Sequence, residues 1–272
     1  MKKGIDVSSW QGNIDWVKVK SNIDFAILRG GYSFDAVDSQ FHRNAKECTR
    51  LGIPFGVYWF SYALNDNEAQ KEADFCCQTI APYKLDYPVC YDWEYDSDNY
   101  ASKMGVNITN NKRASFAKTF LSRIENKGYY AMLYTNYDYL NKGFNQLTQL
   151  YDIWWAQWGV TSASKPYGIW QCADNWHIAG ISGNVDGNIT NNDYPDIIKN
   201  MGKSGSKIYT LTEAIKTNTF KAMTTDWWNK YNIVANDVIL GKYGDGDKRK
   251  EGLKKAGYDY YIVQAIVNQY VG

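Results

Sequence analysis

Three acidic residues stand at alternate positions of the segment "YPVCYDWEYD", which covers residues 87–96: Asp92, Glu94 and Asp96. Successive side chains of a β-strand point to opposite faces, so in a strand Asp92 and Glu94 would share one face, about 6–7 Å apart. Two carboxylates at that distance repel each other, and burial raises the pKa of at least one of them. A carboxyl group that keeps its proton near neutral pH can act as a general acid.

The same segment is also compatible with a solvated edge strand whose carboxylates do no chemistry, because D-x-E patterns are common. The surrounding elements distinguish the two interpretations. Eight segments rich in β-branched and aromatic residues predict strands, at residues 4–9, 25–32, 53–63, 87–95, 129–136, 152–158, 167–173 and 183–189. Helical periodicity separates the early strands, at residues 36–52, 65–80 and 110–128.

Strands that alternate with helices predict an α/β fold with a mostly parallel sheet. Eight strands favour an irregular, TIM-like (β/α)-barrel, and its helical ring is incomplete because the last three strands lie too close together for full helices between them. The active site of such a barrel lies at the C-terminal ends of the strands. Asp92 and Glu94 fall near the end of the fourth predicted strand, which favours the catalytic interpretation.

The composition further limits the ligands and the kinds of functional site that we expect. Aromatic residues make up 16% of the 272 residues, with 11 Trp and 23 Tyr, which is compatible with both sugar stacking and core packing. A net charge of +1 gives no indication of nucleic-acid binding. The five Cys and two His residues form no metal-ligand spacing, so we expect no metal and no cofactor. An apolar run of about 20 residues is absent, so we expect no membrane anchor.

Near Met201 the composition changes to a short linker rich in Gly, Ser and Lys. We expect a barrel domain over residues 1–200, a linker with an unassigned segment over 201–229, and a helical module over 230–272. Three short helices are predicted in this module, at residues 233–240, 247–256 and 260–270. An internal translation start at Met201 would yield the module without the barrel.

Separated motifs along the barrel segment occur in a characteristic order: "GIDVSSWQG", "GVYWFSYA", "YDWEYD", "LYTN", "WWAQW", "GIWQ" and "GNVDGNI". Together they resemble glycoside hydrolase family 25, the Chalaropsis-type lysozymes. The C-terminal segment "VANDVILGKYGDGDKRKEGLKKAGYDYYIVQAIVNQYV" resembles the cell-wall-binding repeat of phage lysozymes, here in one clear copy. The resemblance implies an endolysin that cleaves the β-1,4 bond between N-acetylmuramic acid and N-acetylglucosamine for host cell lysis.

The resemblance also implies roles for four carboxyl groups. Glu94 is the expected general acid that protonates the leaving oxygen. Asp92 is the second catalytic carboxylate, which either supports the substrate's own acetamido group as nucleophile or helps to activate water. Asp6 and Asp186 lie at the ends of the first and eighth strands. Their negative charges would stabilise a positively charged transition state and raise the pKa of Glu94, or the two residues would serve as structural hydrogen-bond acceptors.

Several further residues are candidates for binding. Those expected to bind substrate are Tyr58, Tyr62, Tyr134, Trp10, Trp155 and Gln171, with Trp158 as a further stacking candidate. Core packing is an equally good explanation for the tyrosines, and Arg29 is expected in a buried ion pair. Those expected to bind the cell wall are Tyr243, Asp247, Arg249, Tyr258 and Gln264, although helix capping and core packing explain several of them as well.

The expected partner is the peptidoglycan of a Gram-positive cell wall, and no interaction with nucleic acid is expected. The N-terminal "MKKGIDVSSW" has no apolar signal segment, so we expect synthesis in the host cytoplasm and action on the wall after membrane permeabilisation. A bacterial autolysin exported by another route is an alternative. So are a glycan-binding barrel without activity and a chitinase-like hydrolase. The sequence does not determine the oligomeric state.

Overall fold

The computed structural model of the chain describes residues 1–205 and, between 231 and 267, all residues except 232, 236, 245, 259, 261, 262, 265 and 266. The chain divides into two compact units, Met1–Ser206 and Lys207–Gly272. Of the predicted linker and unassigned segment at 201–229, residues 206–229 lie outside the described residues.

The first unit is a barrel built on one sheet with the strand order β1-β9-β8-β7-β6-β5-β4-β2-β3, closed by pairing of β1 with β2. The strands are β1 (Lys2–Val7), β2 (Phe25–Tyr32), β3 (Ala36–Val37), β4 (Phe55–Phe60), β5 (Val89–Asp92), β6 (Ala131–Asn136), β7 (Asp152–Ala156), β8 (Ile169–Trp176) and β9 (Val185–Thr190). All eight predicted strands are confirmed. The two-residue β3 is an addition, which pairs with the end of β2.

The sheet is mostly parallel, as predicted. From β1–β2 round to β7–β8 the barrel neighbours pair in parallel, and only β9 runs antiparallel to both of its neighbours, β8 and β1. No helix is found between β7 and β9 in this fully described part of the chain. The incomplete helical ring is therefore confirmed on the side where the last strands follow one another directly.

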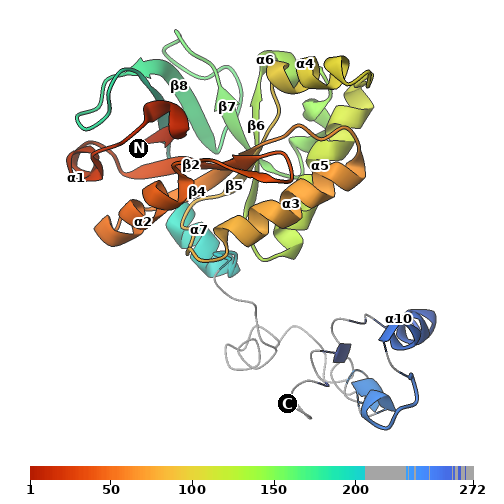
Figure 1. Cartoon of the computed structure of the whole chain (residues 1–272). Helices are drawn as coiled ribbons and strands as arrows, with labels where there is room; N and C mark the ends of the chain where they lie inside the picture. The colour runs from red at the N-terminus through yellow and green to blue at the C-terminus, as the bar shows by residue number, and fades with distance from the viewer. Residues whose placement is uncertain are drawn as a thin grey trace. The chain divides into compact units, whose positions relative to one another are not determined.

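The helices of the first unit are α1 (Trp16–Val19), α2 (Phe41–Leu51), α3 (Asp66–Ile80), α4 (Tyr95–Lys103), α5 (Asn110–Asn126), α6 (Tyr137–Asn141) and α7 (Tyr194–Met201), with 3-10 turns at Ser9–Gln11, Lys20–Asn22 and Phe144–Leu147. Figure 1 shows α3 and α5 side by side on one flank of the barrel. α2 begins later than predicted because Ala36 and Val37 extend the sheet as β3. α4 was not predicted, and it follows the carboxylate segment directly.

Two layers of apolar side chains form the core, because alternate residues of each strand face the helices or the barrel interior. In the outer layer, Phe120, Leu121 and Ile124 of α5 are fully buried against the sheet. In the inner layer, the rings of Phe25 and Tyr87 stack with their centroids 4.4 Å apart. The inner layer also contains Tyr194 and Ile198 of α7, so this helix fills the end of the barrel at which its parallel strands begin.

The barrel unit ends at Ser206 rather than at residue 200 as predicted. Met201 is the last residue of α7, and the residues after it pack on the barrel. Lys203 pairs with Glu125 of α5 at 3.0 Å. Ser204 forms a bridge with Tyr129, and its carbonyl accepts the Leu85 N–H at 3.3 Å. The Gly- and Ser-rich composition that predicted a linker therefore begins within the barrel unit.

The chain's five cysteines all lie in the barrel unit, and all are free thiols. Four are buried: Cys48, Cys76, Cys77 and Cys90. Burial raises the pKa of each of these thiols, to about 12 for Cys77. They pack as small apolar side chains in the core.

The second unit has a small apolar core of its own. α10 (Gly246–Lys255) matches the second predicted helix within one residue at each end. The described residues at 231–239 are helical, as are residues 260, 263, 264 and 267. The core combines side chains from all three segments: Tyr231, Val234, Ala235, Val238, Leu253, Val263 and Val267. The described part thus agrees with the predicted three-helix module.

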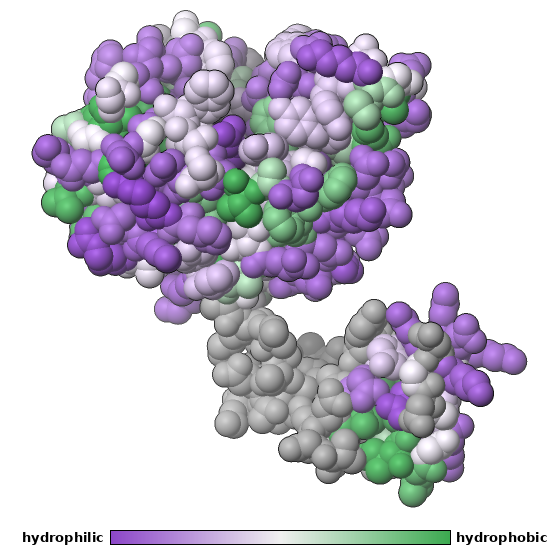
Figure 2. Space-filling model, in the orientation of Figure 1, coloured by the Kyte–Doolittle hydropathy of each residue, from purple (hydrophilic) through white to green (hydrophobic). Residues whose placement is uncertain are grey.

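The visible face of the barrel carries mostly hydrophilic side chains, with small hydrophobic areas between them (Figure 2). Among the described residues, no helix combines the length and the apolar character that crossing a bilayer requires.

Candidate active site at the C-terminal end of the barrel

The two residues of the D-x-E motif lie in different elements. β5 ends at Asp92, and Glu94 is the N-cap residue of α4. The strand itself is confirmed, but its predicted extension from Asp92 to residue 95 is therefore wrong. The Glu94 N–H donates to Ser97 Oγ at 3.2 Å, and the Ser97 N–H donates to the Glu94 carbonyl at 3.0 Å. A serine three residues into a helix with acidic residues in its first turn favours this helix start.

Asp92 is buried inside the barrel and is 5% exposed. Its Oδ1 has no hydrogen-bond partner among the described residues. Burial raises the pKa of Asp92 well above its ordinary value, and the negative charge of Glu94 raises it further. Arg29 opposes this shift as a nearby cation. A buried carboxyl oxygen without a donor is costly in the free protein, which is a typical feature of a functional group.

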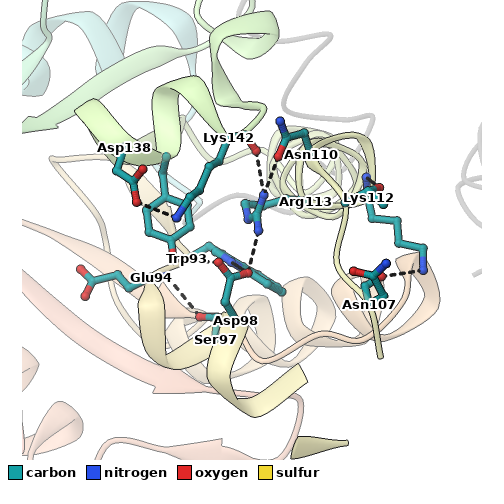
Figure 3. A network of polar contacts seen from close by, with 12 residues as sticks. Trp93, Glu94, Ser97, Asp98, Asn107, Asn110, Lys112, Arg113, Asp138 and Lys142 are labelled. Carbon is teal, nitrogen blue, oxygen red and sulfur yellow. Dashed lines mark hydrogen bonds and ion pairs between the residues drawn. The ribbon is translucent and has the colours of Figure 1, made fainter. Parts of the chain in front are cut away.

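Glu94 is partly buried, and its side chain points away from the polar network that lies behind it (Figure 3). Burial raises the pKa of this carboxyl group, and the charges of Asp186 and Asp96 raise it further. A hydrogen bond with Tyr134 acts in the opposite direction. The raised pKa favours a protonated Glu94, which is the state that a general acid needs.

Asp6 and Asp186 lie opposite each other in the antiparallel register of β1 and β9. Burial raises the pKa of Asp6 to about 6, although hydrogen bonds from Asn188 and Gln171 lower it. Burial and the charge of Asp6 raise the pKa of Asp186 to about 8. Two carboxyl groups with such shifts share one proton near neutral pH. Within the described residues, no group of three or more His, Cys, Asp or Glu side chains is placed to hold a metal ion.

Two amide side chains hold Asp6 in place. Gln171 Nε2 donates to Asp6 Oδ2 at 2.9 Å, and Asn188 Nδ2 donates to the same oxygen at 2.7 Å. Gln171 Oε1 in turn accepts the Tyr134 hydroxyl at 3.0 Å and Trp158 Nε1 at 3.2 Å. These bonds fix the orientation of the Gln171 amide and connect it to the residue that contacts Glu94.

Sequence reasoning missed Asn188 and Trp154. Trp154 Nε1 donates to Asn188 Oδ1 at 2.7 Å, and this bond fixes the second amide. A signal for Asn188 was available, because it stands two residues after Asp186 in β9 and therefore faces the same side of the sheet. Its hydrogen-bond partner Trp154 could not be predicted from the alternation of one strand, because the contact joins β7 to β9 across the sheet. Tyr58 packs edge-on against Trp154, with ring centroids 6.0 Å apart.

A cavity of about 580 Å³ lies beside Glu94 and is lined by Ser9, Trp10, Arg29, Tyr32, Phe60, Tyr62, Glu94 and Asp96. Trp10 is 84% exposed, so its ring is available to a ligand. The Tyr62 hydroxyl donates to Asp96 Oδ2 at 2.6 Å. The cavity therefore combines aromatic rings with carboxylates, which suits a sugar.

Arg29 forms the predicted ion pair. Its Nε lies 2.8 Å from Asp38 Oδ2, and the Asp38 side chain is 1% exposed. Arg29 Nη2 also donates to Ser9 Oγ at 2.9 Å. These bonds fix one wall of the cavity and join β2 to the turn after β1.

Trp155 is not available for sugar stacking, so that prediction is wrong. It is 1% exposed and belongs to the outer core, and its Nε1 donates to Gln157 Oε1 at 3.0 Å. The strand alternation turns the preceding residue, Trp154, to the barrel interior instead. A shift of one residue in register thus decides which of two adjacent tryptophans lies near the site.

The residues predicted to bind the wall lie in the second unit. Arg249 Nη1 donates to Gln264 Oε1 at 3.0 Å, and Arg249 Nε donates to the Gly244 carbonyl at 3.0 Å. Tyr243 and Tyr258 pack against the apolar core of this unit. The side chain of Asp247 lies outside the described residues. These contacts give Arg249 and Gln264 an internal structural role, and wall binding by the five residues stays a prediction.

Known proteins resemble both units. Residues 5–181 match the glycosyl hydrolases family 25, and residues 232–271 match the CW_7 repeat. Lysozyme M1 of Streptomyces globisporus is 27% identical over 199 residues, which cover 68% of this chain and 66% of that protein. The lysozyme of Streptococcus phage Cp-7 is 26% identical over 224 residues, which cover 79% of this chain and 55% of that protein.

The fold agrees with solved structures. The modular autolysin LytC from Streptococcus pneumoniae, in complex with a synthetic peptidoglycan ligand, superposes with a TM-score of 0.59 at 27% identity. The match covers 69% of this chain and 46% of LytC. The chain thus spans about half to two thirds of the length of these relatives. Since the family match covers more than half of its residues, the chain belongs to the glycosyl hydrolases family 25.

Proposed function

We propose that the chain is a peptidoglycan hydrolase, a lysozyme that cleaves the β-1,4 bond between N-acetylmuramic acid and N-acetylglucosamine. One observation carries this proposal: four carboxyl groups with raised pKa values, Asp6, Asp92, Glu94 and Asp186, gather at one end of the barrel. A site that only binds glycan has no need of such a cluster, because each raised pKa reflects a cost in the free protein.

Glu94 is the proposed general acid. Its raised pKa keeps the proton available until it moves to the oxygen of the leaving N-acetylglucosamine, while the bond from this oxygen to C1 of N-acetylmuramic acid breaks. The carboxylate that remains can accept a hydrogen bond from Tyr134, whose hydroxyl would turn to it from Gln171 Oε1. In the second half of the reaction, the same carboxylate takes a proton from the attacking water.

Asp92 is the proposed partner of the substrate's acetamido group. The Oδ1 atom of Asp92 is buried and has no partner among the described residues, so it can accept the acetamido N–H. This bond would orient the acetamido oxygen for attack on C1 and stabilise the positive charge of the cyclic intermediate. In the alternative, activation of water by Asp92, the same oxygen would accept a hydrogen bond from that water.

We further propose that the second unit binds the wall. The match to the CW_7 repeat and the basic composition of α10 support binding to peptidoglycan. The likeness to a streptococcal phage lysozyme supports a Gram-positive wall as the target. It also supports a role in host lysis, with synthesis in the host cytoplasm and access to the wall after membrane permeabilisation.

The test is digestion of purified Gram-positive peptidoglycan by the wild type and by Glu94→Gln, followed by borohydride reduction and mass spectrometry. Reduced muramic acid ends from the wild type alone support the proposal. Reduced glucosamine ends would instead identify a glucosaminidase. Hydrolysis of chitin in place of peptidoglycan would identify a chitinase-like enzyme, and wall binding without new reducing ends would identify a binding protein.

A further inference from the structure

Asp98 receives three side-chain donors directly behind Glu94 (Figure 3). Trp93 Nε1 donates to Asp98 Oδ1 at 3.1 Å, and Arg113 Nη2 donates to the same oxygen at 2.8 Å. The Tyr139 hydroxyl donates to Asp98 Oδ2 at 2.9 Å. Both oxygens of the carboxylate are therefore engaged, one of them by a charged partner, and such hydrogen bonds are stronger than neutral ones.

These donors come from separate elements. Trp93 lies between β5 and α4, Arg113 belongs to α5, and Tyr139 belongs to α6. Arg113 is itself 4% exposed, and its Nη1 donates to the Lys142 carbonyl at 2.8 Å. Asp98 thus joins α4 to α5 through a largely buried ion pair and to α6 through a hydrogen bond.

Both sequence neighbours of Glu94 are held by this network. Trp93 is 1% exposed and is bonded to Asp98. Tyr95 packs on the other side, with its ring centroid 5.2 Å from that of Tyr139. The Asp98 N–H also donates to the Glu94 carbonyl at 3.2 Å. Contacts of the preceding residue Trp93, of the following residue Tyr95 and of Asp98 therefore hold the backbone at Glu94 in position.

α4 has few other contacts with the barrel: the Tyr62 hydroxyl donates to Asp96 Oδ2 at 2.6 Å, and the rings of Tyr62 and Tyr100 pack with their centroids 5.1 Å apart. The helix has nine residues, and helices of this length are marginal in water without tertiary contacts. Its buried residues are Ser97 and Ala101, which together offer little apolar surface. The polar contacts of Asp98 must therefore contribute much of the attachment of α4 to the barrel.

We propose that Asp98 is a positioning residue for Glu94. The network of Asp98, Trp93, Arg113 and Tyr139 holds the N-cap of α4 so that the Glu94 carboxyl group meets the glycosidic oxygen. This inference rests on the proposed role of Glu94 as general acid. A displacement of about 1 Å at a reacting group can lower a rate about 100-fold, so loss of the network lowers proton transfer even though Asp98 touches no substrate.

The test compares two substrates in the full-length protein carrying Asp98→Asn. One is peptidoglycan, whose leaving group needs a proton. The other is a dinitrophenyl glycoside that ends in N-acetylmuramic acid, whose leaving group departs without one. We expect kcat on peptidoglycan to fall roughly 10- to 100-fold with little change in KM. The rate of dinitrophenolate release in the first turnover, which reports only the step that needs no proton from Glu94, should stay within about 2-fold of wild type.

Asp74→Asn is the matched control. Asp74 of α3 accepts from Arg123 of α5 at 2.8 and 3.1 Å, so the variant also breaks an ion pair between a helix and α5, away from Glu94. We expect wild-type rates on both substrates from it. Tyr139→Phe removes one donor to Asp98 and keeps the ring contact with Tyr95. It provides the same comparison with a smaller defect if Asp98→Asn does not fold.

An equal loss of rate on both substrates in these variants, or wild-type kcat on peptidoglycan, would overturn the positioning role. Glu94→Gln separates this outcome from failure of the proposed function. If Glu94→Gln is inactive on peptidoglycan and still releases dinitrophenolate in the first turnover while Asp98→Asn is normal on both substrates, only the inference about Asp98 fails. If Glu94→Gln cleaves peptidoglycan at the wild-type rate, the general acid itself is wrongly assigned, and the inference fails with it.

Discussion

Asp6 and Asp186 face each other across β1 and β9, and the charge of Asp6 helps to raise the pKa of Asp186 to about 8. The antiparallel insertion of β9 creates this pair, because it places the two residues in direct register. In a barrel of parallel strands only, an acidic residue of the last strand would meet the first strand in a different register. The one reversed strand is therefore a determinant of the electrostatics of the site.

This pair makes stability depend on pH. The pKa of Asp186 is raised from 3.8 to about 8, so the folded protein binds more protons than the unfolded chain in this interval. The free energy of unfolding should therefore fall as the pH rises from about 4 to 8. Asp186→Asn should reduce this slope and raise stability at pH 8 relative to wild type, as measured by urea denaturation at a series of pH values.

Asp193→Asn is the control for this measurement. Asp193 lies beyond the end of β9 and forms an exposed ion pair with Lys2, and Asn preserves its function as helix cap. We expect the slope of the wild type to persist in this variant. An unchanged slope in Asp186→Asn would show that the two carboxyl groups do not share a proton in the folded protein.

Glu94→Gln should lower kcat on peptidoglycan by about 10²- to 10⁴-fold, since an amide cannot donate the proton to the leaving oxygen. The wild-type rate should decline as the pH rises through the raised pKa of Glu94, because the acid is then ionised before substrate binds. Rates of reducing-end release across the pH range give both results. Glu47→Gln on the surface of α2, where Glu47 pairs with Arg50, should leave the profile unaltered.

Trp10→Ala should raise KM by roughly 3- to 10-fold without a change in stability. The ring is 84% exposed beside the cavity at Glu94, so its removal costs little in the folded protein and loses a platform for a sugar ring. Leu150→Ala, which truncates a side chain that is 58% exposed, is the control for loss of exposed apolar surface. An unchanged KM would place the sugar elsewhere in the cavity.

Arg249→Ala should weaken binding to intact walls and leave kcat on soluble glycan unaltered. The guanidinium group joins Gly244 to Gln264 within the second unit, so its loss should loosen that unit alone. Arg249→Lys should fail in the same way, because an ammonium group cannot reproduce two bonds from one planar fork. Cosedimentation with purified walls measures the effect. Full binding by Arg249→Lys would show that charge, rather than geometry, is what the wall requires.

Much of the fold could be predicted because strands and helices leave periodic patterns in the sequence. The N-cap at Glu94 could not, because the aromatic alternation of the strand continues through Trp93 and Tyr95 after the strand has ended at Asp92. Only the position of the following helix shows that Glu94 is an N-cap residue and not part of the strand.

The choice between Trp154 and Trp155 failed for another reason. Two adjacent tryptophans fit either face of β7, and only the register with β6 and β8 decides which of them turns inward. The contacts of Asn188 likewise depend on closure of the barrel, which brings β1, β8 and β9 together. Chemistry that is local in sequence was thus predictable, whereas partners from distant strands were not.

The free thiols of the barrel have a consequence for the proposed action of the protein at a cell wall. Proteins that work in oxidising surroundings often rely on disulfides, which form only there. Here four thiols are buried with raised pKa values, so little reactive thiolate is available to oxidants or to partner cysteines. The barrel is therefore stabilised without disulfides, by core packing, hydrogen bonds and ion pairs, and oxidising surroundings would require no change in its covalent structure.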